Sequence, residues 1–159
     1  MNEAQILLDN GAGSQTPKRI VVHAMGEFID TEPEDYFAVE YLRKLGLSAH
    51  AFITPSGVVI RSRADNQGGY HAKGFNTDSL GVEFLVPGLH TYATFVEAIK
   101  RKYLSTAQYQ AGVALVQKWR TEHNIATIDR HSDLSPGRKV DPGKGFPWEQ
   151  FLADTGFGQ

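Results

Sequence analysis

The chain contains no cysteine, so disulfide bonds cannot hold its fold and thiolates cannot bind a metal. Any metal ion must be held by histidine, aspartate, glutamate or water. Long apolar runs are missing too, because the N-terminal region has only Ile6-Leu7-Leu8, far shorter than the apolar core of a signal peptide. No later segment is apolar enough to span a bilayer. We therefore expect cytoplasmic synthesis without a signal peptide, and no insertion into a membrane.

Concentrated positive charge is also scarce. The formal net charge is -2 at pH 7, and no stretch gathers the many lysines and arginines that a surface following nucleic-acid phosphates requires. Nucleic acid is therefore not an expected partner. With 159 residues, of which 41% are apolar, the chain is long enough to bury one core. We expect one domain over residues 1–159, acting as a monomer.

Strand and helix patterns alternate along the chain. Short apolar runs predict strands over 20–22, 49–53, 58–63, 81–86 and 125–128, and Pro55-Ser56-Gly57 predicts a hairpin turn between the second and third. Helical spacing predicts helices over about 33–45, starting at Pro33, and from Ser105 to about 123, where Ser105 and Gln108 have capping-box spacing. These patterns predict an α/β domain with a central mixed β-sheet flanked by helices.

Histidines and acidic residues at the ends of these strands suggest a metal site. Of the histidines at 23, 50, 71, 90, 123 and 131, His23 ends the first strand and His131 follows the last. The polar, turn-rich segment 131–143 can fold Asp141 back toward His131. Two imidazoles and one carboxylate form a suitable catalytic zinc site with an open fourth position. The alternative is that Asp141, before Pro-Gly, only starts a turn.

Four motifs in order carry a resemblance to a known family. They are Ile20-Val21-Val22-His23, Ser48-Ala49-His50-Ala51-Phe52-Ile53, the segment from His71 to Glu83, and the segment from His131 to Gly143. With these motifs, residues 20–153 resemble the type-2 N-acetylmuramoyl-L-alanine amidases, which include phage endolysins, anhydro-muropeptide amidases and peptidoglycan recognition proteins. The resemblance implies the fold of these proteins and hydrolysis of the bond between the lactyl group of N-acetylmuramic acid and L-alanine in peptidoglycan.

The resemblance also implies roles for individual residues. Zinc would be held by His23, His131 and Asp141, with Glu83 as the catalytic carboxylate and Lys139 as a cation beside the developing oxyanion. A carboxylate can take the proton of the attacking water, and an ammonium can stabilise negative charge on the former carbonyl oxygen. For Glu83 and Lys139 the alternatives are an outward residue of an edge strand and a solvated charge.

Other polar residues have two interpretations each. His50 either lines the cleft and assists the transition state or hydrogen-bonds a neighbouring turn, and His71 either binds substrate or orients a loop. Asp133 is expected beside a ligating histidine or capping a turn. Candidates for binding the acidic peptide stems are the polar residues Arg63, Lys73, Asn76 and Arg138, each of which could instead be ordinary surface.

Three functions follow from the resemblance. The first is a phage-type endolysin that acts on the cell wall after release, because the stretch from His71 to Gly81 is similar to phage members. The second is a cytosolic amidase that recycles anhydro-muropeptides, because small phage enzymes often have a cysteine where this chain has Asp141. The third is a non-catalytic peptidoglycan-binding module. A regulatory role through contact with another protein is a separate hypothesis, for which the sequence contains no motif.

The segment 88–104 is longer than the corresponding link in most relatives. Helical spacing predicts a short helix beside the cleft, with Tyr92, Phe95, Val96 and Ile99 facing inward. The three cations after it, Lys100-Arg101-Lys102, are expected to be exposed. They could hold the acidic glycan-peptide polymer, or they could be an ordinary solvated surface.

Overall fold

The computed structural model describes residues 2–26 and 34–158. Its central sheet has the strand order β1 (Glu3–Gln5), β5 (Val59–Arg61), β4 (Ala51–Ile53), β7 (Ser79–Leu85), β3 (Arg19–Met25) and β8 (Thr127–Arg130). The β4–β5 pair is antiparallel and the other neighbours are parallel. The sheet is therefore mixed, as predicted. A separate antiparallel pair joins β2 (Gly13–Ser14) to β6 (Gln67–Gly68).

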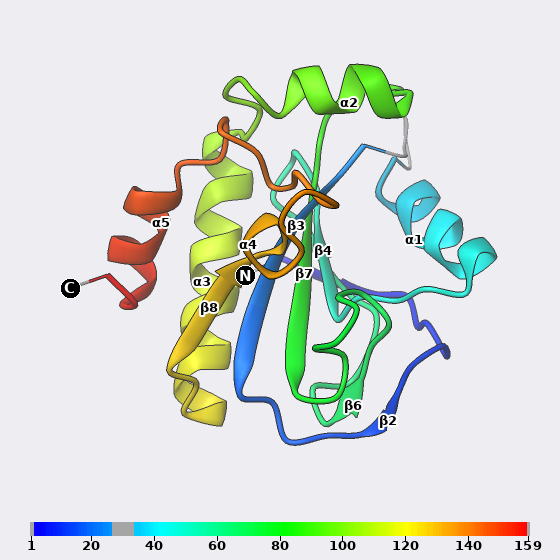
Figure 1. Ribbon diagram of the computed structural model, residues 1–159, viewed down its shortest axis with the longest axis vertical. Helices are drawn as coiled ribbons and strands as arrows, with labels where there is room; N and C mark the ends of the chain where they lie inside the picture. The colour runs from blue at the N-terminus through cyan, green and yellow to red at the C-terminus, as the bar shows by residue number, and fades with distance from the viewer. Residues whose placement is uncertain (1, 27–33, 159) are drawn as a thin grey trace.

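Helices cover both faces of the sheet (Figure 1). Helices α3 (Thr106–His123) and α5 (Trp148–Thr155) lie on one face, and α1 (Glu34–Leu45) lies on the other. Helix α2 (Tyr92–Ala98) crosses the end of the sheet at which β3 and β7 finish, and the single turn α4 (His131–Leu134) follows β8. The α/β prediction is thus confirmed. None of the described helices combines the length and the apolar character that a membrane crossing requires.

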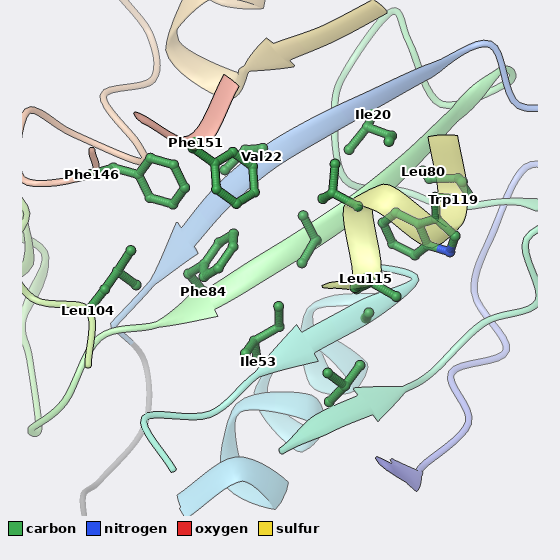
Figure 2. Close-up of a cluster of buried hydrophobic side chains, with 14 of the residues drawn as sticks. Ile20, Val22, Ile53, Leu80, Phe84, Leu104, Leu115, Trp119, Phe146 and Phe151 are labelled. Atoms are coloured by element: carbon green, nitrogen blue, oxygen red, sulfur yellow. The ribbon is translucent and has the colours of Figure 1, made fainter. Parts of the chain in front are cut away.

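Alternation along β3 and β7 decides which side chains enter the core. Ile20 and Val22 of β3 and Leu80 and Phe84 of β7 pack against Trp119 of α3 and other residues of the same cluster (Figure 2). Successive side chains of a strand point to opposite faces. His23 and Glu83, each next in sequence to one of these core positions, therefore point to the face that α1 covers.

The predicted strands and helices are present with shifted ends. Strand β3 runs on to Met25, because its pairing with β7 continues as far as Met25 opposite Leu85. His23 is thus inside the strand and not at its end, contrary to the prediction. The predicted start of α1 at Pro33 lies outside the described residues. The sequence patterns missed β1, the β2–β6 pair and α5.

The segment 88–104 contains the predicted helix, with one error in its buried face. Phe95 and Ile99 are buried, and Val96 packs partly against the same apolar cluster. Tyr92, however, keeps 62% of its surface exposed. Tyr92 is the first residue of α2 and lies at the rim of a cavity described below. The buried face of this helix therefore does not include Tyr92.

Helix α3 is attached to the sheet through Gln108. The Ser105 side chain caps the helix by accepting from the Gln108 backbone N–H at 2.9 Å. The reciprocal half of the predicted capping box is absent, because the Gln108 side chain turns to the sheet. Its amide donates to the carbonyl oxygens of Ile53 at 2.9 Å and Leu85 at 2.8 Å. Gln108 is fully buried and holds α3 to the ends of β4 and β7.

Replacing Gln108 by leucine keeps most of the volume but leaves two buried carbonyls without this donor. An unsatisfied buried group costs roughly 1–3 kcal/mol, so we expect Gln108→Leu to lower the free energy of unfolding by about 2 kcal/mol. Urea denaturation followed by circular dichroism would measure it. The matched control is Gln110→Leu, at an exposed position of the same helix. Equal midpoints for the two variants would contradict this role of Gln108.

Candidate active site

Strand register brings the predicted site residues together. His23 of β3 is directly opposite Glu83 of β7. On the other edge of β3, β8 pairs as far as Val22 opposite Arg130, so His131, the next residue, lies beside His23. His23 and Glu83 lie in the carboxyl-terminal halves of β3 and β7, and His131 directly follows β8. This end of an open α/β sheet is the usual place for a ligand site.

Three candidate metal ligands converge at this end of the sheet. The Nδ1 atoms of His23 and His131 are 3.0 Å apart, and a carboxylate oxygen of Asp141 lies 3.4 Å from the first and 3.2 Å from the second. All three side chains are buried. Three Lewis bases facing one point is the arrangement that a metal cation satisfies, and His₂Asp is a suitable catalytic zinc set. The residues present thus fit the metal that the sequence predicted.

Asp141 reaches this point because the segment after β8 folds back on itself. The segment begins with the helical turn α4 and not with the loop that was expected. The Ser132 N–H donates to the Asp141 carbonyl at 2.9 Å, and the Ala24 N–H donates to its carboxylate at 3.3 Å. Asp133 points elsewhere, since its exposed carboxylate pairs with Arg130 at 2.9 Å. Of the two roles expected for Asp133, support of a ligating histidine is therefore wrong, and the residue instead lies in the first turn of α4.

Protonation states in the cluster suit cation binding. Burial lowers the pKa of His23 to about 4, which keeps the imidazole neutral. Burial opposes ionisation of Asp141, but hydrogen bonds from His131 and His23 outweigh it, and the pKa of Asp141 falls below its usual value. Metals bind neutral imidazole and ionised carboxylate, and these two pKa shifts favour a neutral His23 and an ionised Asp141.

Glu83 is the carboxylate next to this cluster. A carboxylate oxygen of Glu83 lies 3.9 Å from Nδ1 of His23, and the side chain is buried. Burial, and then the negative charge of Asp141, raises the pKa of Glu83 well above its usual value, while Lys139 acts in the opposite direction. A carboxylate with a raised pKa is a stronger base at neutral pH than an ordinary surface glutamate.

His71 supports the candidate ligand His23 from behind. Nδ1 of His71 is 2.9 Å from Nε2 of His23, and its other nitrogen is 3.1 Å from the Ser79 hydroxyl. A β-carbon on Gly81 would lie 2.6 Å from the His71 ring, so only glycine at position 81 leaves room for it. Metal-binding histidines commonly use their second nitrogen in this way. The supporting group expected at Asp133 is thus found at His71.

His50 is fully occupied by backbone groups. Its Nδ1 accepts from the Gly81 N–H at 3.0 Å, which requires the proton on Nε2, and Nε2 donates to the Gln67 carbonyl at 2.7 Å. The ring is buried and does not line the cavity at the site. These contacts match the alternative in which His50 hydrogen-bonds a neighbouring turn.

An open cavity of about 380 Å³ leads to the cluster. Glu83 and Lys139 line it together with the three candidate ligands, and so do several predicted substrate-binding residues, namely His71, Lys73, Asn76 and Arg138. Asn76 also accepts from the His71 and Ala72 N–H groups and so shapes its own loop. The lining also has an aromatic part, which comprises Tyr41, Tyr70, Tyr92 and Phe95. The sequence analysis placed Tyr92 and Phe95 on a helix beside the cleft, but it did not predict that any of the four would line the cavity. The motifs contain no signal for these residues.

Arg63 is the predicted substrate-binding residue that the structure places away from this cavity. Its guanidinium is buried and donates to the carbonyls of Gly68 at 2.7 Å, Leu8 at 3.1 Å and Asp9 at 3.2 Å. Arg63 therefore fastens the N-terminal arm to the loop after β5.

Comparison with known proteins agrees with this geometry. The sequence profile of a family described as N-acetylmuramoyl-L-alanine amidase matches residues 13–144. The chain belongs to this family. Its reaction class is therefore that of a peptidoglycan amidase. A curated relative, the 1,6-anhydro-N-acetylmuramyl-L-alanine amidase of Haemophilus influenzae, is 27% identical over 138 residues, which are 80% of this chain and 67% of that protein.

Solved structures share the fold. The N-acetylmuramoyl-L-alanine amidase LysC from Clostridium intestinale superposes with a TM-score of 0.75 at 23% identity, covering 98% of each chain. A complex of the peptidoglycan recognition proteins LCa and LCx with tracheal cytotoxin gives a TM-score of 0.68 at 19% identity, covering 91% of this chain and 92% of that one. The predicted amidase and peptidoglycan-recognition-protein fold is confirmed.

The converging ligands predict one divalent metal ion per chain. We expect His131→Ala to lose it, because the two remaining candidate ligands are too few for a tight site. Metal content per chain would be measured by inductively coupled plasma mass spectrometry after dialysis. The control is His90→Ala, on the loop before α2, which should keep the metal of the parent. Full metal content in His131→Ala would count against this ligand set.

Proposed function

We propose that the metal is zinc and that the chain hydrolyses the amide bond between the lactyl group of N-acetylmuramic acid and L-alanine in peptidoglycan. The observation that carries this proposal is the convergence of His23, His131 and Asp141 beside the buried carboxylate of Glu83. Membership of the amidase family supports the bond that is cut. The complete set of ligands with Glu83 argues against a non-catalytic binding module.

Bound there, zinc would supply Lewis-acid chemistry that activates a water molecule and polarises the substrate carbonyl. Glu83 is the general base in this proposal: its carboxylate accepts the proton of the attacking water and passes it to the leaving amine of L-alanine. Its raised pKa suits both transfers, since the group must take up a proton and release it again.

Lys139 is proposed to stabilise the negative charge that develops on the former carbonyl oxygen. It lines the cavity, and its charge acts on both Glu83 and His23. Lys73, Asn76 and Arg138 are proposed to contact the acidic peptide stem from the same cavity. His50 and Arg63 act only by holding backbone in this proposal, because their polar atoms already bond backbone carbonyl and N–H groups.

Changing Glu83 to glutamine removes the base while keeping size and shape. General base catalysis contributes roughly 10²- to 10⁴-fold, so we expect the rate of amide cleavage to fall by about that factor while zinc content and folding stay intact. Release of peptide from a soluble muropeptide would be followed by chromatography. Glu149→Gln, on the exposed start of α5, is the matched control. Turnover of Glu83→Gln near that of the control would assign the base to another group.

Two biological roles use this reaction. We propose lysis of intact wall, as in phage endolysins, on the basis of the stretch from His71 to Gly81. The second candidate is recycling of anhydro-muropeptide fragments, which is favoured by the curated relatives, whose names describe 1,6-anhydro-N-acetylmuramyl-L-alanine amidases. Both roles require the same site, so the substrate must distinguish them.

Purified sacculi and soluble anhydro-muropeptides separate the two roles. For a lytic enzyme we expect both to be cleaved, with mass spectrometry showing peptides that begin with a free L-alanine amine. Glu83→Gln should release none from either. Cleavage of the soluble fragments with intact sacculi left untouched would overturn the lytic role and establish recycling.

A further inference from the structure

The connection between α2 and α3 lies directly against the loop that carries the candidate ligand Asp141. The Tyr103 hydroxyl donates to the carbonyl of Pro142, the residue after Asp141, at 2.8 Å. Three residues further along the loop, the Gly145 N–H donates to the Ile99 carbonyl at 2.7 Å. A segment that is far from this loop in sequence is thus bonded to it at two points.

The two segments touch backbone to backbone. A β-carbon on Gly145 would lie 1.8 Å from the Arg101 carbonyl oxygen, so no other residue fits at position 145 without moving one of the segments. This close contact fixes the distance between the 141–146 loop and the connection that follows α2. The loop cannot move toward the connection, and its hydrogen bonds to Ile99 and Tyr103 oppose movement away.

Tyr103 is itself firmly placed. Its ring packs against both apolar clusters, one of which contains Phe146 and the other Ile99. Burial, and then the charges of Asp141 and Glu83, raises the pKa of the Tyr103 hydroxyl well above its usual value. The hydroxyl therefore stays protonated and remains a donor to the Pro142 carbonyl.

The backbone at Asp141 is held from both sides. The Ser132 N–H of α4 donates to the Asp141 carbonyl at 2.9 Å, and Tyr103 donates to the next carbonyl along the chain. With two successive carbonyls engaged, the direction in which the Asp141 side chain leaves the backbone is restricted. A metal ligand needs this restriction, because small displacements of a ligand atom weaken the site.

We propose that Tyr103 is a positioning residue for Asp141, and that the segment 88–104 serves the metal site through this hydroxyl. The proposal rests on the zinc site of the proposed function. It assigns to the segment a role that is independent of Lys100, Arg101 and Lys102. Of these cations, Lys100 already pairs with Glu97.

Tyr103→Phe is the decisive variant, because it keeps the packed ring and removes only the donor. Loss of a group that supports a metal ligand typically costs 10- to 100-fold in metal affinity, and we expect a fall of about that size. Zinc affinity would be measured by competition with a chromophoric chelator. The visible absorption spectrum of the cobalt-substituted protein would report the geometry of the site, and we expect it to change. The melting temperature of the metal-free protein should fall by only about 2–4 °C, because a single hydrogen bond is lost.

Tyr109→Phe is the matched control. The Tyr109 hydroxyl donates to Asp154 of α5 at 2.6 Å, so this variant also loses one tyrosine hydrogen bond. We expect it to keep the zinc affinity and the cobalt spectrum of the parent.

Two outcomes would overturn the positioning role while leaving the zinc site intact. The first is a parent that binds zinc tightly and a Tyr103→Phe variant that binds it equally well with an unchanged cobalt spectrum. The second is a variant whose metal-free form melts earlier but whose zinc affinity is unchanged, which would make Tyr103 a purely structural residue. A parent that binds no zinc would refute the proposed function, and the positioning role with it.

Discussion

The pairing of β3 with β7 on one edge and β8 on the other is the interaction on which the site depends. It places His23 opposite Glu83 and brings His131, directly after β8, to the same end of the sheet. A shift of one residue in this register would turn His23 into the core face and Val22 into the cavity. The apolar packing of Ile20 and Val22 against α3 therefore also fixes where the polar residues go.

The polar cluster is costly for the fold unless something compensates for it. His23, His131, Asp141 and Glu83 are buried within a few ångströms of one another, and His71 packs against His23. Burial lowers the pKa of His23 and raises the pKa of Glu83, and both shifts favour the neutral form of the side chain. A cation at the point where the ligands converge would satisfy them together, so part of its binding free energy would stabilise the fold. With such a cation bound, function and stability would be coupled at this end of the sheet.

The segment 88–104 connects the cavity wall to the ligand loop. Its helix contributes Tyr92 and Phe95 to the lining of the cavity. The residues after the helix, from Ile99 to Tyr103, bond the loop that carries Asp141. One continuous segment thus touches the space for substrate and the backbone of a candidate ligand. A change in its length or packing would act on both.

The sequence by itself determined the α/β class, most strands and helices, and the residues that meet at the site, because these follow from local periodicity and from motifs whose spacing the fold preserves. Only the tertiary structure decided the contacts of single polar side chains. His50 and Arg63 bond backbone that is distant in sequence, Asp133 pairs with Arg130 at the surface, and Tyr103 reaches Pro142. The identity of a polar residue gives the hydrogen bonds it can form, but the partners are chosen by packing between segments that no local pattern relates.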